Sequence, residues 1–359
     1  MRFAPALALL LAASLSAEQT LFSTLKMQPG IYVWDGFTRG PRAALAERIG
    51  DADKAGFHAI RLLLSPASAR SYSLSARCRT LACLFQDEGL QQALATPSVK
   101  VVMFTTYDFA SYPRQHFLDP DFLKANRQRV FDEYRELAEA ILQKNAGTGR
   151  LFVIGHWEGD NQVYCGSSYD FQTVDEKRYG CLYQQPEKRL RGLTEWLRIR
   201  QEAIADARRR VAAKNVEIYH AAEFNTIFAT RKVSGASIRS KEYRGVLDTV
   251  VPAVHPDVCS YSAWESVNRN RLTKDLQDIL KACAPAPVIV GEIGVKDNPD
   301  KRYAKIVSAL APLRDSIPLV FFWQAIEEPG AKDAGFGLFS PDGRPLHPKA
   351  LESIHHLIP

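Results

Sequence analysis

Two glutamates follow short apolar runs of the kind that form buried strands. Glu158 ends LFVIGHWE at residues 151–158, and Glu292 lies in VIVGEIG at residues 288–294. Burying a carboxylate without a partner is costly, so a glutamate at such a position is a candidate for a specific chemical task. Two carboxyl groups in different environments can act as proton donor and nucleophile, which is the chemistry that hydrolyses a glycosidic bond. We therefore predict Glu158 and Glu292 as a catalytic pair.

Aromatic and hydrogen-bonding side chains end most of the other apolar runs. Aromatic rings stack on the apolar faces of sugars, while carboxylates and amides bind sugar hydroxyls. A phosphate site would instead need a glycine-rich loop at a helix N-terminus, and the sequence contains no such motif. The mixture predicts a carbohydrate ligand and no cofactor. Besides the two glutamates, the candidate substrate-binding residues are Arg61, Trp34, Trp157, Asn161, Glu223, Asn225, Tyr261 and Trp323.

Eight β-rich apolar runs alternate with helical patterns along the chain, which is typical of a parallel sheet with helical crossovers. Eight strands in one domain of this length predict a closed (β/α)8 TIM barrel. The loops that follow the strands of such a barrel build its active site, so the candidate residues would gather at one mouth. The predicted strands cover residues 30–36, 59–65, 99–107, 151–158, 216–224, 257–262, 288–294 and 319–325.

Two of the predicted helices are clearly defined. Asp119 and Pro120 are residue types favoured at a helix start, and the apolar residues after them recur at helical spacing. A second helix lies between the fourth and fifth predicted strands. Their apolar stripes indicate core packing and are formed by Val130, Tyr134, Leu137 and Ile141 in the first, and by Leu190, Leu193, Leu197, Ile204 and Val211 in the second.

The composition is that of an ordinary globular protein, with 46% hydrophobic and 24% charged residues. The formal charge of +6 is modest, and Lys and Arg are scattered or lie on helix faces. We therefore predict no nucleic-acid partner, and we expect a monomer.

The first segment, MRFAPALALLLAASLSAEQ, combines Arg2, a short apolar run and the small residues around Ser14 to Ala17. This pattern indicates a secretory signal peptide over residues 1–17, followed by one domain over residues 18–359. The apolar run is well short of the roughly 20 residues that span a bilayer, and no later segment is long enough either. We predict a secreted or periplasmic protein with no transmembrane segment after signal cleavage.

Export makes the six cysteines informative, because they form three pairs that are close in sequence. Local disulfides are predicted, although other pairings are compatible with the sequence. Zinc binding is the alternative, and no C-x-x-C or H-x-x-x-H spacing supports it. The predicted pairs are Cys78 with Cys83, Cys165 with Cys181, and Cys259 with Cys283.

The order of several motifs resembles that of clan A glycoside hydrolases, the retaining (β/α)8 group that includes cellulase-like enzymes. The motifs are HWEGDN, DVCSYSAWES, VIVGEIGV and FFWQAIEEPG, followed by GFGLFSPDGRPLHPKALESI. The resemblance covers essentially the whole chain after the N-terminal segment. It implies a β-linked glycan as substrate and a double-displacement mechanism without a cofactor.

The resemblance also implies roles for single residues. Glu158 would be the acid/base and Glu292 the nucleophile. Arg61 would lie near Glu292 and keep it ionised, and Tyr261 would hydrogen-bond the same carboxylate. Trp323 would form the floor under the sugar that is cleaved.

One position departs from the pattern of the group, whose members usually carry Asn immediately before the acid/base to bind the sugar 2-hydroxyl. Trp157 occupies that place here, and Asn161 or Asn225 could supply the amide. The departure keeps a second hypothesis open, a glycan-binding protein that has lost activity. It also makes Glu223 a rival for the acid/base role.

A metal-dependent barrel hydrolase is a third hypothesis, because several potential ligands could converge at the same mouth. It is the weakest, since the first predicted strand lacks the H-x-H pair that such enzymes usually carry. The potential ligands are His156, Asp160, His220, Glu223 and His255.

Overall fold

The computed structural model describes residues 21–34, 45–164, 186–227, 230–233, 241–328, 330 and 334–358. The predicted signal peptide, Cys165 and Cys181 lie outside the described residues. Within the described part of the chain, no helix is both long enough and apolar enough to cross a membrane.

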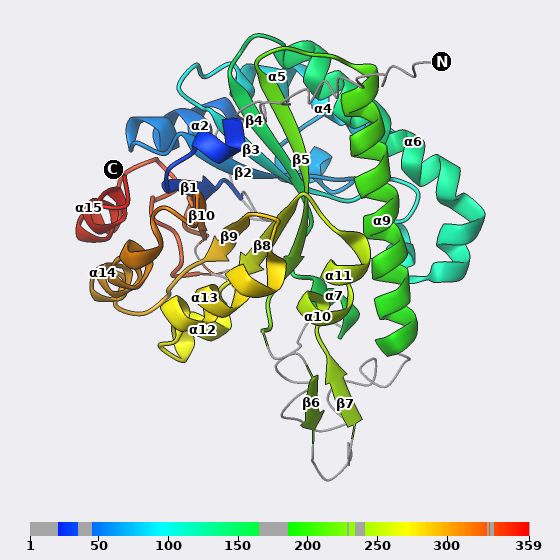
Figure 1. Cartoon of the computed structure of the whole chain (residues 1–359). Coiled ribbons are helices and arrows are strands. Elements are labelled where there is room, and N and C mark those ends of the chain that lie inside the picture. Colours follow the sequence, from blue (N-terminus) through cyan, green and yellow to red (C-terminus); the bar gives the residue numbers. More distant parts are fainter. Residues whose placement is uncertain are drawn as a thin grey trace, which may run out of the picture.

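Eight parallel strands close into a barrel, which confirms the predicted (β/α)8 fold. Their order around the barrel is β1-β10-β9-β8-β5-β4-β3-β2, so each barrel strand pairs with its neighbours in the chain and β1 pairs with β10. Figure 1 shows the strands at the centre of the molecule and the helices around them. The strands are β1 (Gln28–Tyr32), β2 (Ala59–Leu64), β3 (Val101–Thr106), β4 (Arg150–Gly155), β5 (Val216–Phe224), β8 (Val258–Ser262), β9 (Val288–Ile293) and β10 (Leu319–Phe322).

A two-stranded antiparallel hairpin follows β5 and is not part of the barrel. It consists of β6 (Thr230–Val233) and β7 (Lys241–Arg244), and it projects from the body of the molecule (Figure 1). The sequence analysis did not predict it, because TRKV and KEYR lack the apolar alternation that marks a strand packed on a core.

The two longest helices are α6 (Pro120–Asn145) and α9 (Pro186–Arg210), which lie side by side on one flank of the barrel (Figure 1). The Asp119 side chain caps α6 by accepting the Asp121 N–H at 3.1 Å, and Pro120 is the first helical residue, as predicted. The predicted apolar stripes of both helices are buried, except that Val211 lies just beyond the end of α9.

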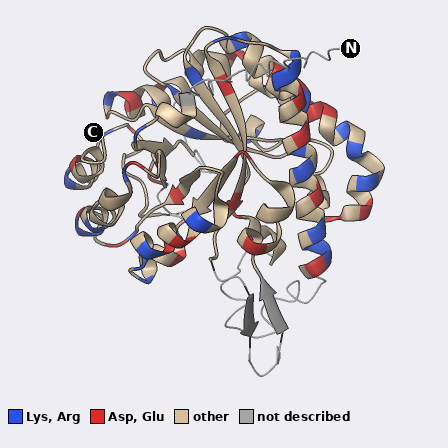
Figure 2. Cartoon of the chain, in the orientation of Figure 1, with Lys and Arg blue, Asp and Glu red and all other residues tan. Residues whose placement is uncertain are grey.

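Shorter helices complete the outer layer. Figure 2 shows Lys and Arg interspersed with Asp and Glu along the outer helices. The remaining helices are α1 (Leu21–Thr24), α2 (Leu45–Lys54), α3 (Ser68–Ser71), α4 (Leu81–Phe85), α5 (Glu88–Leu94), η1 (Pro113–Leu118), α7 (Gly159–Val163), α10 (Val246–Thr249), α11 (Val251–Val254), α12 (Trp264–Asn268), α13 (Leu272–Cys283), α14 (Pro299–Leu310), η3 (Ala311–Leu313) and α15 (Pro348–His355).

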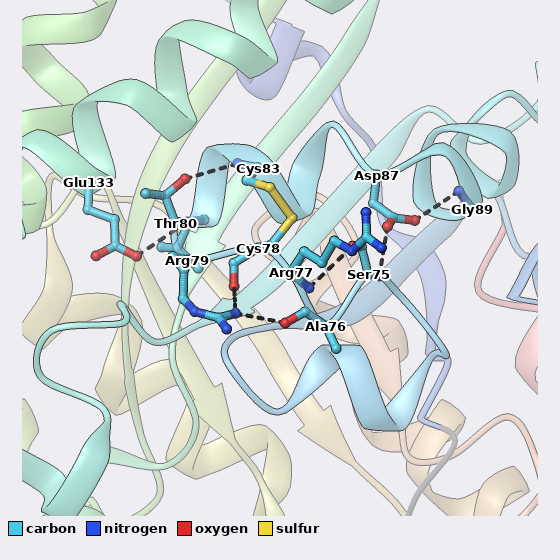
Figure 3. The surroundings of a disulfide bond; sticks show 11 residues. Ser75, Ala76, Arg77, Cys78, Arg79, Thr80, Cys83, Asp87, Gly89 and Glu133 are labelled. Carbon is cyan, nitrogen blue, oxygen red and sulfur yellow. Dashed lines mark hydrogen bonds between the residues drawn. A yellow bond between two sulfur atoms is a disulfide. The ribbon is translucent and has the colours of Figure 1, made fainter.

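Two of the predicted disulfides are present. Cys259 of β8 is bonded to Cys283 at the end of α13, and Cys78 is bonded to Cys83 in α4. Figure 3 shows the second bridge, where the Thr80 hydroxyl caps α4 by accepting the Cys83 N–H at 3.2 Å. The connection from β2 to β3, which contains this disulfide, forms three short helices, α3 to α5.

The core has two parts, as barrel geometry requires. The larger part packs the outward faces of the strands against the helices. The smaller part fills the barrel interior with inward-facing residues. The interior residues are Ala59, Val101, Met103, Leu151, Val153, Ala221, Val258, Ile289, Leu319 and Phe321, joined by Phe22 of α1.

Candidate active site

A polar layer lies directly above the apolar filling of the barrel. Side chains alternate in direction along a strand, so the residue two places beyond each apolar interior residue also points inward. On four strands this residue is polar and buried. These residues are Arg61 on β2, Thr105 on β3, Glu223 on β5 and Ser260 on β8.

Arg61 is the centre of the polar layer, and all five of its N–H groups have partners. Nε donates to Thr105 Oγ1 at 2.9 Å, and the two Nη atoms donate to both Glu223 oxygens at 2.8 and 3.0 Å. The other two N–H groups donate to the carbonyl oxygens of Gly291 at 2.6 Å and His156 at 3.3 Å. Burial lowers the pKa of Arg61, but the charges of Glu223, Tyr32 and Glu292 and the hydrogen bonds to Glu223 together outweigh it and raise the pKa overall. Arg61 is therefore a fully buried, paired cation.

The polar layer has room in the barrel only because the residue of β9 at the same level is a glycine, Gly291. A Cβ on Gly291 would lie 2.1 Å from Ser260 Oγ and 2.2 Å from Glu223 Oε2. The pairing of β9 shifts register on both sides near this point, between Tyr261 and Ser262 of β8 and between Val320 and Phe322 of β10. The residue after Gly291, Glu292, thereby joins the inward-facing groups.

Glu158 lies just beyond β4 and is 4% exposed. Its Oε1 accepts the Ser262 hydroxyl at 2.6 Å, and its Oε2 accepts Asn161 Nδ2. Its backbone N–H donates to Glu223 Oε1 at 3.1 Å, and its φ of 27° lies in the left-handed region that non-glycine residues rarely adopt. Several contacts thus hold this glutamate in an unusual backbone conformation.

Glu292 lies in β9 and is also 4% exposed. Its Oε1 accepts the indole N–H of Trp264 at 2.9 Å. Its Oε2 is buried and receives no hydrogen bond from the described residues, and Arg61 Nη1 lies 3.8 Å away. One oxygen of Glu292 is therefore held, and the other is free to react.

Ser262 brings the two glutamates together. Its hydroxyl holds Glu158, and its backbone is paired with Glu292 across the β8–β9 ladder. The structure thus places both sequence-predicted catalytic residues at the same end of the barrel, above the polar layer.

Both carboxyl groups bind protons more tightly than usual. Burial raises the pKa of Glu158 to about 7, and the negative charge of Glu223 adds to this effect. Burial also raises the pKa of Glu292 well above its usual value, and the charge of Glu158 adds to it. Because each carboxylate disfavours ionisation of the other, the pair tends to share one proton near neutral pH.

Aromatic rings lie at the same end of the barrel. Trp323, at the end of β10, packs edge-on against Tyr32 with ring centroids 4.8 Å apart and lies 6.2 Å from Trp34. The Tyr32 ring in turn lies 4.8 Å from the guanidinium carbon of Arg61. Trp264 packs edge-on against Phe336 at 5.3 Å. Trp34 and Trp323 were predicted from sequence, whereas Trp264 was not assigned to the site.

The two predicted asparagines lie together beside Glu158. Asn225 Nδ2 donates to Asn161 Oδ1 at 3.1 Å, and Asn161 in turn donates to Glu158. Asp160 fixes this arrangement by accepting the backbone N–H groups of Asn225 at 3.0 Å and Val246 at 2.8 Å. Trp157 is half-buried, and its backbone N–H donates to a tyrosine hydroxyl.

The expected role of Tyr261 is wrong. Its hydroxyl bonds to Ser266 Oγ at 2.6 Å, and its ring stacks on Phe224, which belongs to the outer part of the core. The reason is strand alternation: Ser260 and Ser262 point inward, so Tyr261 points outward. The alternation was visible in the sequence. The donor to Glu292 is Trp264, which comes three residues later.

Arg61 lies near Glu292, as expected: its Nη1 is 3.8 Å from Glu292 Oε2, and its charge opposes the rise that burial causes in the pKa of Glu292. Its hydrogen bonds, however, go to Glu223, and the role considered for Glu223 is not supported. Glu223 is completely buried, with both oxygens bound by Arg61, so it is not placed to act as an acid/base or to bind substrate.

Two of the three histidines considered as metal ligands have other partners. His156 Nε2 accepts the Glu223 N–H at 3.0 Å, and His220 Nδ1 lies 2.9 Å from Gln201 Oε1. Over the described ranges, no three His, Cys, Asp or Glu side chains gather closely enough to hold a metal ion.

Comparison with known proteins identifies the architecture. No protein-family model matches the sequence, and no curated protein matches it. Solved structures do match over most of their length. A family 5 xyloglucanase from Paenibacillus pabuli is 10% identical with a TM-score of 0.58, and the alignment covers 95% of this chain and 100% of that one.

Two further structures give the same result. A GH5_18 protein from Streptomyces cattleya, in complex with GlcNAc, is 15% identical with a TM-score of 0.57, covering 93% of this chain and 80% of that one. A GH5-4 broad-specificity endoglucanase from Clostridium acetobutylicum is 13% identical with a TM-score of 0.56, covering 91% and 96%. The chain therefore shares the barrel fold of family 5 glycoside hydrolases, as the resemblance implied.

Proposed function

We propose that the protein is a retaining glycoside hydrolase that cleaves a β-linked oligo- or polysaccharide with Glu292 as nucleophile and Glu158 as acid/base. The observation that carries this proposal is the buried pair itself. Two carboxyl groups with raised pKa values lie at adjoining positions at the C-terminal end of the barrel, and within the described part of the chain no group donates to one oxygen of Glu292.

The contacts support this division of roles. Glu292 is nearer the positive charge of Arg61, which favours its ionised form, and its Oε2 is available to attack. Glu158 then holds the shared proton and donates it to the departing glycosidic oxygen. In the second step Glu158 takes a proton from water, which cleaves the glycosyl–Glu292 ester with net retention.

The aromatic residues support a sugar as substrate. Trp34, Trp323 and Trp264 are partly exposed, Trp264 contacts Glu292, and indole rings stack well on the apolar faces of sugars. The endoglucanase and xyloglucanase among the similar structures are consistent with a β-linked glucan. Trp323 is assigned to the floor under the cleaved sugar.

The test uses Glu292→Gln, Glu158→Gln and the parent protein on a panel of β-glucans, mannans and galactans. We expect Glu292→Gln to abolish cleavage. Glu158→Gln should lose most activity on polysaccharides. With aryl glycosides that have good leaving groups, which need little protonation, it should still release the aryl group in a first burst, while the following hydrolysis of the glycosyl–enzyme is slow because the base is missing. Glu217→Gln, on β5 and distant from the pair in sequence, is the matched control and should retain activity. Retention is checked by proton NMR of the first product anomer.

An inactive glycan-binding protein is the second candidate, and Trp157 in place of the usual Asn is the observation that favours it. If the parent and Glu292→Gln bind a glycan equally and neither releases product, this candidate replaces the hydrolase. The hydrogen bond from Asn161 to Glu158 favours the hydrolase. It places an amide beside the proposed acid/base, although Asn161 comes three residues after Glu158 and the usual Asn comes immediately before it.

We also propose that the protein is exported and monomeric. The disulfides Cys78–Cys83 and Cys259–Cys283 support an oxidising compartment. N-terminal sequencing of protein recovered from the periplasm or the medium tests cleavage near residue 17. Size-exclusion chromatography with light scattering tests the monomer.

A further inference from the structure

Glu223 makes more contacts than any reaction step assigned above requires. Its carboxylate accepts four hydrogen bonds: two from Arg61, one from the Ser260 hydroxyl at 2.8 Å, and one from the Glu158 backbone N–H at 3.1 Å. It is completely buried. A carboxylate saturated in this way does not bind substrate, so its role must act through its partners.

One of those partners is the acid/base. Glu158 has a positive φ, and a non-glycine residue keeps such a conformation only where its surroundings impose it. The bond from its N–H to Glu223 Oε1 is one such restraint. The next residue, Gly159, packs so closely that a Cβ there would lie 2.7 Å from the carbonyl oxygen of Glu223. The backbone that carries the acid/base thus rests on Glu223.

The other partner is the cation nearest to the nucleophile. Arg61 has no N–H left for Glu292, although its Nη1 lies only 3.8 Å from Glu292 Oε2. The negative charge of Glu223 therefore neutralises Arg61 at short range. Without that charge, an unbalanced buried cation would face both catalytic carboxylates.

We propose that Glu223 is a positioning residue of the glycosidase site: it fixes the Glu158 backbone and cancels the charge of Arg61, so that the catalytic pair retains one shared proton. This inference rests on the proposed function. The charged, titratable and donor groups described beside the pair are Arg61 from β2, Glu223 from β5, the Tyr32 hydroxyl at the end of β1, and the Trp264 indole from α12. Arg61 is the only cation among these groups.

The predicted effect of Glu223→Gln has a defined sign. The substitution keeps the shape but removes the negative charge. Without the Glu223 charge, its repulsion of the Glu158 and Glu292 carboxylates is lost, and the charge of Arg61 is uncompensated. Both effects favour ionisation of Glu158 and Glu292. Both pKa values should fall by at least about one unit, which is within the usual range for a nearby charge.

The experiment follows the carboxyl titrations by carbon-13 NMR in protein labelled at glutamate Cδ, with assignments from Glu158→Gln and Glu292→Gln. Glu223→Gln should move both midpoints, and both limbs of the kcat/KM–pH profile, to lower pH. Glu217→Gln, the same change on the same strand, should move neither. A folded Glu223→Gln protein whose midpoints match those of the parent overturns the inference.

A second variant covers the case in which Glu223→Gln does not fold because Arg61 is left buried and unpaired. The double variant Arg61→Gln/Glu223→Gln restores neutrality, and its midpoints should return to within about half a unit of the parent values. Midpoints displaced by a full unit or more in the double variant would overturn charge cancellation. Because the NMR titration needs no substrate, absence of glycan cleavage by the parent counts against the proposed function alone.

Discussion

At the scale of single residues, an indole holds the proposed nucleophile. The Trp264 N–H donates to Glu292 Oε1, and a hydrogen bond to a carboxylate favours its ionised form. Trp264→Phe should therefore raise the pKa of Glu292 and move the acidic limb of the kcat/KM–pH profile to higher pH. A hydrogen bond to a charged group is worth about 1.5–3 kcal/mol, so the rate should fall by roughly 10- to 100-fold.

The control for this prediction is Tyr261→Phe. It removes a hydroxyl that bonds Ser266 and does not contact Glu292, so the acidic limb should stay in place. If the acidic limb of the kcat/KM–pH profile moves in Tyr261→Phe and stays in place in Trp264→Phe, Trp264 is not the residue that stabilises the ionised form of Glu292.

These two residues show what the sequence could and could not predict about the site. Glu158 and Glu292 could be found because each comes at the end of an apolar run and carries a charge that burial makes expensive. The pairing of Arg61 with Glu223 could not, because it depends on which inward-facing residues meet across the barrel axis. Gly291 was a local signal for this pairing. Because glycine has no side chain, it leaves room in the barrel for the Glu223 carboxylate.

At the scale of elements, one helix anchors two connections through a single carboxyl group. Glu133 of α6 accepts the N–H of Leu81 at 3.2 Å and that of Phe109 at 2.9 Å, both through Oε1. It thereby ties the start of α4, beside the disulfide in Figure 3, and the chain after β3 to the same helix. Burial raises the pKa of Glu133 to about 7.

This raised pKa makes the anchor sensitive to pH. The folded state holds the Glu133 proton more tightly than the unfolded state, so the free energy of unfolding falls as pH rises from about 4.5 to 7. Glu133→Gln keeps an oxygen acceptor for both N–H groups without the buried charge. The variant should resemble the parent near pH 5 and exceed it in stability at pH 8, by on the order of 2 kcal/mol.

Urea unfolding at the two pH values measures this difference. Glu133→Leu, which loses the acceptor, should be destabilised at both. A parent protein more stable than Glu133→Gln at pH 8 would show that the ionised carboxylate is favourable at this position.

The elements themselves were predictable where they bury an apolar face. All eight barrel strands and the two long helices follow from periodicity and capping residues. The hairpin of β6 and β7 was missed because its strands pair with each other outside the barrel. The three short helices after β2 were missed because four- to seven-residue helices have too few turns to show a period.

At the scale of the whole molecule, the two described disulfides close loops of very different length. Cys259 and Cys283 are 24 residues apart, and Cys78 and Cys83 are five apart. Loop-closure entropy in the unfolded chain predicts stabilisation of about 3.5 kcal/mol for the longer loop and about 2 kcal/mol for the shorter one. Cys259→Ala/Cys283→Ala should therefore lower the free energy of unfolding more than Cys78→Ala/Cys83→Ala.

Denaturant unfolding of both double variants without reductant measures the two losses. Equal losses, or a larger loss for the shorter loop, would show that native contacts rather than chain entropy dominate.

The backbone pairing of Ser262 with Glu292 has an evolutionary consequence. The spacing of the two acidic groups is set by the β8–β9 ladder and by a serine within it, and therefore depends little on the connections that rise around the mouth. Under the proposed function, exchanging those connections for ones of other length would change which glycan can reach the two carboxyl groups and leave their mutual spacing intact. Descendants of one such barrel could then differ in substrate and keep the same pair of glutamates.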